Sequence, residues 1–311
     1  MFSEKRNKII DCPFDEGNES MTPEEAYAIR EHGKKNGAGW KIRVVPNLYA
    51  PVSKTVPESC DSEYFKIRDG YGYAEIIIET PIHNQTMDSY SINQFELYFQ
   101  AIINRIVEIS KDKRIKLIQI FKNNGPDSGA SQTHQHSQII AIPFIPKEIV
   151  NRFKRLKRYY EKNGSSYFYD LVEHEVASDK RVVLKNADFV AICPYDSKTP
   201  FEIMIVPTGN MTSMIFMNNQ EIVSLAEIFK KLMAALRKKL RDFSFNIIFN
   251  EPPLRYRAIE KFFRFYINII PKLTVQGGFE QATGIFINPQ PPEKAAKELR
   301  TALNYGAEGR T

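Results

Sequence analysis

The sequence predicts an α+β protein that contains two copies of one strand–strand–helix–strand–strand unit. Short runs rich in β-branched residues are bounded by Pro, Asn or Gly, and longer segments between them carry apolar residues at helical spacing. The same order of elements recurs in the second half of the chain. We therefore expect two tandem units, over residues 1–150 and 151–311, each a mainly antiparallel sheet with a packed helix.

The first copy begins at Trp40. Apolar residues at helical spacing between Ser91 and Lys111 predict its helix. A polar loop, NNGPDSGAS, precedes its last strand. The strands expected in this copy are WKIRVVPN, AEIIIETP, IKLIQIF and QIIAIPFIP.

The second copy repeats this order with similar spacing. Its helix is expected from about Asn219 to Leu240, and a charged amphipathic helix near Asn151–Lys162 joins the two copies. The Pro-rich tail INPQPPEKAAKELRTAL is expected to turn and close with a helix over the body. The strands expected in this copy are FVAICPY, FEIMIVP, FNIIFNEPP and FRFYINIIPKLT.

Composition narrows the class of protein. The 311 residues are 42% hydrophobic and 26% charged, as in soluble globular proteins. No apolar stretch is long enough to span a membrane, and the start MFSEKRNKIIDCPFD lacks the pattern of a secretory signal. The separated Cys12, Cys60 and Cys193 do not form a disulfide framework and indicate a reducing cytoplasm. The net charge of +6 gathers on amphipathic helices, which favours solvated helix faces over a nucleic-acid-binding surface.

The stretch GASQTHQHSQ places two of the chain's five histidines, His134 and His136, one residue apart at the start of a strand. Aligned on the proline near the end of each strand, the second copy carries Arg264 in place of His136. It carries Tyr266 in place of Gln138. A packing role common to both copies would require histidine twice, so its single occurrence indicates a functional site.

This pattern suits the transfer of a phosphorus-centred group. Residues His134, His136 and Gln138 would project to one face of a strand. A neutral imidazole can attack phosphorus if a backbone carbonyl holds its other ring nitrogen as a donor. The preceding Gly-Ala-Ser loop offers N–H groups and a hydroxyl to phosphate oxygens. Glutamine can bind the phosphoryl group without transferring a proton, which favours transfer to a second phosphate over hydrolysis.

GASQTHQHSQ resembles the signature of the galactose-1-phosphate uridylyltransferases, the transferase branch of the histidine-triad superfamily. The resemblance covers most of the chain and implies two histidine-triad-like halves, a role in galactose metabolism and a homodimer. Other segments resemble family motifs in the same order: DCPFDEGNESMTPEE, WKIRVVPN, YAEIIIETPIHNQT, FKNNG, VEHEVASDKRVVLKNADFVAICPY and GGFEQATGIFINPQPPE.

The resemblance implies a nucleotidyltransferase that uses a nucleotide sugar and a sugar 1-phosphate. His136 would attack the α-phosphorus, release the sugar 1-phosphate and carry the nucleotidyl group to a second sugar phosphate. For this reaction the protein needs to supply little beyond positioning of the reacting groups and stabilisation of the charge on the phosphoryl oxygens. The residues implied in holding substrate are Gln138 and Ser131 at the phosphoryl group, Asn47 and Asn123 near the nucleotide, and Glu280 near the sugar.

The resemblance also implies a structural zinc site. The matching residues are Cys12, Asp15, His83 and His134, in which Asp15 replaces a more usual cysteine. The alternative is a vestigial site in which Cys12 is a small buried hydrophobe. A second metal is not expected, because Arg264 and Tyr266 replace histidines there although Glu175 is kept.

The segment before Cys12 is short for the phosphate-binding arginines that the family carries there. Lys122, Arg43 and Lys272 are candidates to replace them. Which base and sugar are bound stays open.

Three interpretations follow from these residues. UDP-glucose and galactose 1-phosphate form the leading substrate pair. Phosphorolysis of an ADP-sugar or a dinucleoside polyphosphate would use the same His136 and Gln138. A catalytically retired nucleotide-binding homologue would keep the scaffold without turnover, but the presence of both residues argues against it.

Overall fold

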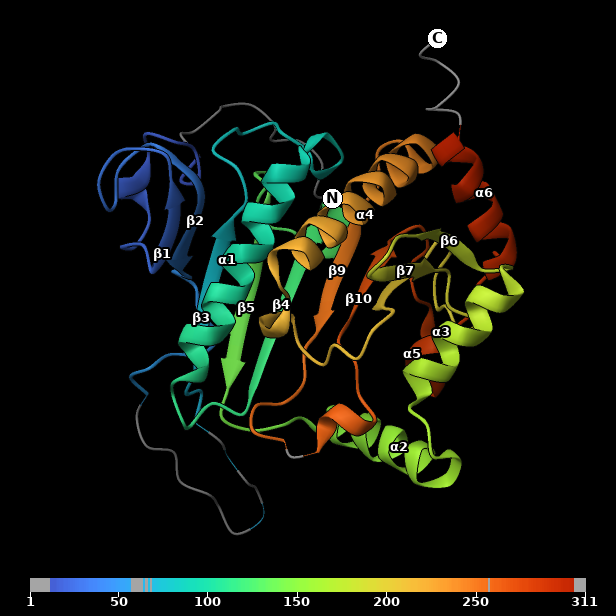
Figure 1. Cartoon of the computed structure of the whole chain (residues 1–311). Coiled ribbons are helices and arrows are strands. Elements are labelled where there is room, and N and C mark those ends of the chain that lie inside the picture. The colour runs from blue at the N-terminus through green and yellow to red at the C-terminus, as the bar shows by residue number, and fades with distance from the viewer. Residues whose placement is uncertain (1–11, 57–63, 65–66, 68, 257, 305–311) are drawn as a thin grey trace.

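A computed structural model describes residues 12–56, 64, 67, 69–256 and 258–304, which form one ten-stranded antiparallel sheet with helices on both faces (Figure 1). The α+β class is therefore confirmed. The strands are β1 (Tyr27–Arg30), β2 (Trp40–Pro46), β3 (Tyr73–Ile78), β4 (Leu117–Asn124), β5 (His136–Ile142), β6 (Val182–Lys185), β7 (Phe189–Ile192), β8 (Ile203–Pro207), β9 (Phe245–Asn250) and β10 (Tyr266–Pro271). The helices are α1 (Ile92–Ser110), α2 (Lys147–Asn163), α3 (Tyr167–Ser178), α4 (Asn219–Leu240), α5 (Gly278–Thr283) and α6 (Pro292–Asn304).

The strand order shows the duplication directly. The sheet reads β1-β2-β3-β5-β4-β9-β10-β8-β7-β6, so the second half mirrors the first about its centre. Helix α1 follows β3 as α4 follows β8. The repeated unit contains one strand more than expected, because β1 and β6 each extend an outer edge.

The two halves meet at the pairing of β4 with β9. Ile120 lies opposite Phe249 and Asn123 lies opposite Asn246. A continuous backbone ladder thus crosses from one half to the other, and the boundary at residue 150 stays a prediction.

Helices α1 and α4 cover one face of the sheet (Figure 1). Ser91 caps α1 by accepting a hydrogen bond from Gln94, and Asn218 caps α4 in a capping box with Glu221. The rings of Phe99 on α1 and Phe229 on α4 lie 5.2 Å apart in an edge-to-face contact at the centre of the core. The charged helix joining the halves is α2, and the closing tail helix is α6.

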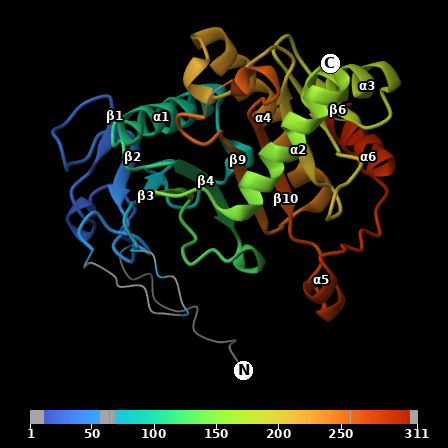
Figure 2. The same cartoon turned by 90° about the horizontal axis from the view of Figure 1, so that it is seen from below.

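The opposite face is covered differently in the two halves. In the second half, α2 lies against it, and Arg152 donates hydrogen bonds to Asn250 at 2.7 Å and to the hydroxyl of Tyr266 at 2.9 Å. In the first half this face bears His136 and Gln138 and is hollowed by a cavity. Helix α5 stands clear of the main body (Figure 2). None of the helices in the described ranges has both the length and the apolar character of a membrane span.

Candidate active site

The site is built around His136, the first residue of β5. Its Nδ1 lies 2.8 Å from the backbone oxygen of His134. A carbonyl oxygen can only accept, so Nδ1 carries the proton and Nε2 carries the lone pair. Burial, followed by the nearby charge of Lys122, lowers the pKa of His136, which keeps the imidazole neutral. The backbone-held, neutral histidine expected from the sequence is thus present.

His136 opens onto a cavity of about 360 Å³ on the face opposite α1. Gln138, Asn47 and Ser131 also line this cavity, where the family resemblance led us to expect them. Much of the remaining lining is apolar, and the Phe14 ring lies 5.5 Å from the His136 ring. No lysine or arginine from the described part of the chain lines this cavity. The geometry therefore offers neutral donors and one nucleophile beside an apolar wall.

Two residues expected near the substrate lie elsewhere. The side-chain oxygen of Asn123 accepts a hydrogen bond from Asn246 at 2.8 Å, and Asn123 does not line the cavity. Glu280 lies on α5, where its carboxylate accepts from the N–H of Gly277 at 3.0 Å. It borders a separate cavity of about 780 Å³ together with Lys272. Within one chain, the structure does not bring Glu280 to His136.

His134 does not share the open face with His136 and Gln138, so that expectation was wrong for this residue. It precedes β5, and its ring lies fully buried beside Asp15. The metal-ligand role expected for His134 fits this position better, because the chain has not yet adopted the alternation of a strand.

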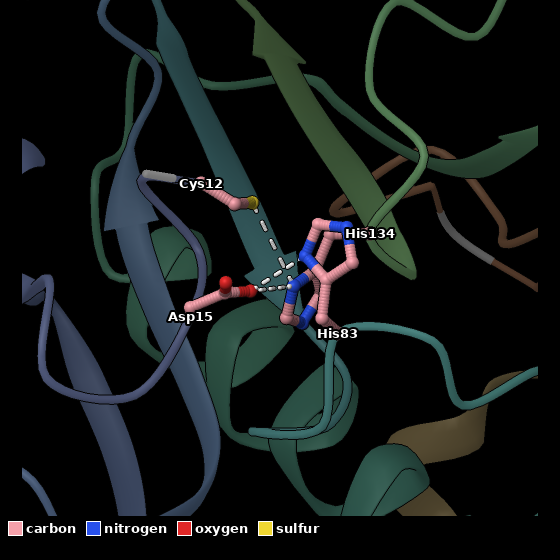
Figure 3. Close-up of side chains that lie close together, drawn as sticks. All are labelled: Cys12, Asp15, His83 and His134. Atoms are coloured by element: carbon pink, nitrogen blue, oxygen red, sulfur yellow. Dashed lines mark hydrogen bonds and ion pairs between the residues drawn. The ribbon is translucent and has the colours of Figure 1, made fainter. Parts of the chain in front are cut away.

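Cys12, Asp15, His83 and His134 converge on one point (Figure 3). Their ligand atoms all lie within 4.8 Å of one another. The carboxylate of Asp15 lies 2.7 Å from Nδ1 of His83 and 2.9 Å from Nδ1 of His134. Burial raises the pKa of the Cys12 thiol. Burial also acts to raise the pKa of Asp15, but the hydrogen bonds with His83 and His134 outweigh it and lower this pKa.

The protonation of His134 tests whether these residues fit a metal. Its Nε2 lies 2.7 Å from the carbonyl oxygen of Thr80, so Nε2 carries the proton in the neutral ring. Nδ1 then presents a lone pair to the Asp15 oxygen, and two acceptors this close need a cation or a proton between them. A backbone partner on the second nitrogen is the usual support of a metal-binding histidine. The residues therefore fit a divalent cation such as zinc.

Two of the three basic side chains that were candidates for binding phosphate are buried in ion pairs. Lys122 is 1% exposed and forms an ion pair with Glu79 at 2.9 Å, inside the core beneath β5. Arg43 is equally buried and binds Glu25 at 3.2 Å. Sequence reasoning missed Glu79, although a carboxylate and an ammonium within apolar strands could have indicated a buried pair.

Known protein families and relatives match both halves of this chain. The model of the galactose-1-phosphate uridyl transferase N-terminal domain matches residues 5–146, and that of the C-terminal domain matches residues 151–253. The chain is 30% identical over 303 residues to an ADP-glucose phosphorylase of Arabidopsis thaliana, covering 94% of this chain and 82% of that protein. The chain belongs to the galactose-1-phosphate uridylyltransferase family. This is a family of nucleotidyltransferases.

Other members of the uridylyltransferase family extend the match. A galactose-1-phosphate uridylyltransferase of Thermotoga maritima is 28% identical over 263 residues, covering 82% of each chain. The crystal structure of an Arabidopsis thaliana ADP-glucose phosphorylase with bound ADP-glucose superposes with a TM-score of 0.82 at 30% identity, covering 95% of this chain and 92% of that one. A uridylyltransferase structure at 23% identity has a TM-score of 0.83, covers 98% of this chain and 94% of that one, and shows that the fold is shared.

The positions at which the family resemblance implied a second metal make other contacts in this chain. Arg264 donates to the carbonyl of Gly209 at 2.6 Å and to Ser166 at 2.7 Å. The carboxylate of Glu175 accepts two hydrogen bonds from Arg181, at 3.0 and 2.8 Å. Arg264 and Glu175 thus each have partners of their own in the second half of this uridylyltransferase homologue.

Proposed function

We propose that this protein transfers a nucleoside monophosphate from a nucleotide sugar to a sugar 1-phosphate through a covalent intermediate on His136. Nε2 attacks the α-phosphorus, a P–N bond forms, and the bond from this phosphorus to the sugar phosphate breaks. The sugar 1-phosphate leaves with that electron pair. A phosphate oxygen of the second sugar 1-phosphate then attacks the same phosphorus, and Nε2 recovers its lone pair.

One observation carries this proposal. Nε2 of His136 has no hydrogen-bond partner among the described residues, while Nδ1 is held by His134, and the ring borders the cavity. Gln138 and Ser131 border the same cavity and can donate to the phosphoryl oxygens as charge develops. The default substrates are UDP-glucose and galactose 1-phosphate.

A second candidate is phosphorolysis of an ADP-sugar at the same histidine. The relative that is 30% identical over 94% of this chain is named ADP-glucose phosphorylase, and a homologous structure binds ADP-glucose. The first half-reaction would be the same, with an adenylyl group in place of a uridylyl group. Inorganic phosphate would then replace the sugar 1-phosphate as acceptor.

Labelling at the α-phosphate tests both candidates. The purified protein is incubated with α-³²P-labelled UDP-glucose or ADP-glucose, and His136→Asn serves as the control. Stable label on the wild type that is lost in the variant supports the covalent intermediate. Chase with galactose 1-phosphate or inorganic phosphate then identifies the acceptor. Absence of label with every nucleotide sugar tried would favour a retired nucleotide-binding protein.

We propose that zinc occupies the cluster of Cys12, Asp15, His83 and His134. The convergence of two imidazole lone pairs, a thiol and a carboxylate supports this. Zinc would stabilise the segments that carry these residues. Elemental analysis of the purified chain is the test, and a zinc content far below one per chain would end the proposal.

We also propose that the protein works in the cytoplasm. Cys12 and Cys193 are free and buried, which suits a reducing compartment.

We further propose a homodimer in which residues 273–287 pack against a second copy. Apolar side chains in this segment lie in solvent: Val275 is 94% exposed and Ile287 is 63% exposed. Such a projecting apolar segment is costly in a monomer. It also carries Glu280, which a partner's cavity would receive. Light scattering after gel filtration should give twice the chain mass for the wild type. It should give a monomer for Val275→Asp/Ile287→Asp.

A further inference from the structure

The ion pair of Lys122 and Glu79 is sealed inside the protein directly behind the site. The side chains are 1% and 0% exposed. The ammonium of Lys122 donates to both carboxylate oxygens of Glu79, at 2.9 and 3.0 Å. Its third donor reaches the backbone oxygen of His136 at 3.1 Å. All three donors of the ammonium are therefore used, and one of them holds the main chain of His136.

Hydrogen bonds extend this pair into the first two residues of β5. Ser137 donates to Glu79 at 2.6 Å, and the hydroxyl of Tyr98 on α1 lies 2.7 Å from that of Ser137. Tyr90 donates to the second carboxylate oxygen at 3.2 Å. Neighbouring residues of a strand face opposite sides of the sheet. This network therefore binds β5 on the face covered by α1, while the His136 ring lies on the opposite, open face.

Overall stability does not require this ion pair. The strand β5 is paired to β3 from His136 onward and to β4 from Gln138 onward, so the main chain of His136 has a paired strand on one side and Lys122 on the other. Burying two charges costs several kcal/mol of desolvation, and apolar side chains of similar size often give equal or greater stability. A contribution to overall stability therefore explains the pair poorly. Its contact with the main chain of His136 explains it better.

The second copy supports the same conclusion. Phe121 lies opposite Gln138 on β5, and Asn250 lies opposite the matching Tyr266 on β10. The next residue along the chain is Lys122 in the first copy and Glu251 in the second. Glu251 instead accepts a hydrogen bond from the backbone N–H of Met214 at 3.0 Å. The copy that lacks the histidine thus also lacks the lysine.

We propose that Lys122 and Glu79 are positioning residues for nucleotidyl transfer, holding the main chain of His136 so that its imidazole keeps the orientation of attack. This inference rests on the proposed role of His136 as nucleophile. The pair acts through the carbonyl of His136 and through Ser137, and it touches no substrate. Small misplacements of a reacting group slow catalysis by about 100-fold even when binding is kept.

The test replaces the charged pair with a neutral one, Lys122→Met/Glu79→Gln. The matched control is Arg105→Met/Glu75→Gln, which neutralises another buried ion pair in the same half, held at 2.8 Å. Single-turnover labelling by the nucleotide sugar is measured against its concentration. We expect the maximal rate to fall about 100-fold in the Lys122 variant, with half-saturation changed less than about threefold. The control should keep both values close to those of the wild type.

A rate no lower than that of the control would overturn the proposal, as would a change confined to half-saturation. If the double variant does not fold, Ser137→Ala removes only the hydroxyl that links Glu79 to β5. It should slow labelling about tenfold, since one buried hydrogen bond of about 1.4 kcal/mol is lost. Wild-type labelling by Ser137→Ala would then contradict the inference.

A nitrogen NMR measurement separates this inference from the proposed function. With five histidines in the chain, ¹⁵N-histidine spectra are simple to assign by comparison with His136→Gln. The wild type should show the Nδ1–H tautomer of His136, and Lys122→Met/Glu79→Gln should show mixed tautomers or exchange broadening. An unchanged tautomer in the variant would overturn the positioning role. Failure of the wild type to label would overturn the proposed nucleotidyl transfer, and the tautomer spectra would still show whether the ion pair orients the His136 ring.

Discussion

The backbone oxygen of His134 holds Nδ1 of His136 at 2.8 Å, while the ring of His134 contacts Asp15 at 2.9 Å in the metal cluster. The residue that orients the proposed nucleophile is therefore itself held by the proposed zinc cluster. A change at Asp15 reaches His136 through only one intervening residue, so we expect zinc binding and the proposed reaction to be coupled.

Replacing Asp15 tests this connection. Asp15→Cys restores a second thiolate, and we expect it to retain zinc at chelator concentrations that strip the wild type, because thiolate is the preferred ligand of structural zinc. Asp15→Ala should lose zinc and lower the melting temperature. Zinc content after dialysis and thermal unfolding are the measurements. Glu24→Ala, at an exposed carboxylate, is the control and should match the wild type. Equal zinc retention by all four proteins would contradict the prediction.

The amide of Gln138 is expected to bind the phosphoryl group only as charge develops on it. Gln138→Leu keeps the size of the side chain and removes its donor. We expect kcat/KM to fall about 100-fold, mainly in kcat, as for the loss of one donor to a developing oxyanion. Steady-state kinetics with the donor found by labelling is the measurement.

Gln119→Leu is the matched control for Gln138→Leu. Gln119 lies on the neighbouring strand and donates to backbone oxygens of Ile120 and Phe249, both at 2.9 Å, and it does not line the cavity. The Gln119→Leu substitution should leave kcat near the wild-type value. Similar losses in both variants would show that the glutamine acts through the sheet and has no direct role at the phosphorus.

Glu251 should make stability depend on pH near neutrality. Burial raises its pKa from 4.5 to about 7, despite hydrogen bonds from Ser213 and from the backbone N–H of Met214. A pKa raised by folding means that the folded state binds the proton more tightly. The stabilisation is complete below the unfolded pKa and is lost as pH rises through about 7.

Glu251→Gln keeps a hydrogen-bond acceptor and removes the titration. We expect the variant to gain free energy of unfolding relative to the wild type above pH 7, by up to about 3 kcal/mol, with little difference near pH 5. Urea unfolding at several pH values is the measurement. The exposed Glu24→Gln should follow the wild-type pH profile. Identical slopes for the wild type and Glu251→Gln would show that Glu251 does not titrate in this range.

Mixing two inactive variants tests the shared site of the proposed dimer. His136→Asn lacks the nucleophile, and Glu280→Ala lacks the carboxylate that a partner would supply. If equal amounts of the two subunits exchange at random, half of all dimers are heterodimers, and each heterodimer contains one complete site out of two. Activity should therefore return to about a quarter of the wild-type value. Steady-state activity after mixing is measured beside each variant alone. No recovery despite exchange, followed by mass spectrometry of tagged subunits, would place Glu280 outside the partner's site.

The sequence predicted the regular elements well where local signals were strong. Ser91 followed by apolar residues at helical spacing located α1, and the same logic located α4. The edge strands β1 and β6 were not among the strands expected from the sequence. Helix α3 was missed because its segment was interpreted only through its resemblance to a linker. The pairing of β4 with β9 lies between residues far apart in the chain, and no local pattern encodes it.

The site was predictable where chemistry concentrates in one stretch. His136, Gln138 and Ser131 lie within eight residues, and the structure places all three at one cavity. Lys122 was considered a candidate for phosphate binding because its partner Glu79 lies 43 residues away, directly after β3. The charge of a side chain is visible in sequence, but its burial is decided by tertiary packing.

The central seam between β4 and β9 has a consequence for the origin of the chain. Antiparallel pairing of equivalent strands is self-complementary: the same edge, rotated by half a turn, matches itself. An ancestral single unit could have closed its exposed edge by pairing with an identical molecule. Gene duplication and fusion would then have freed one half to lose its histidines and accept α2 across the vacated face, while the other half kept the reaction.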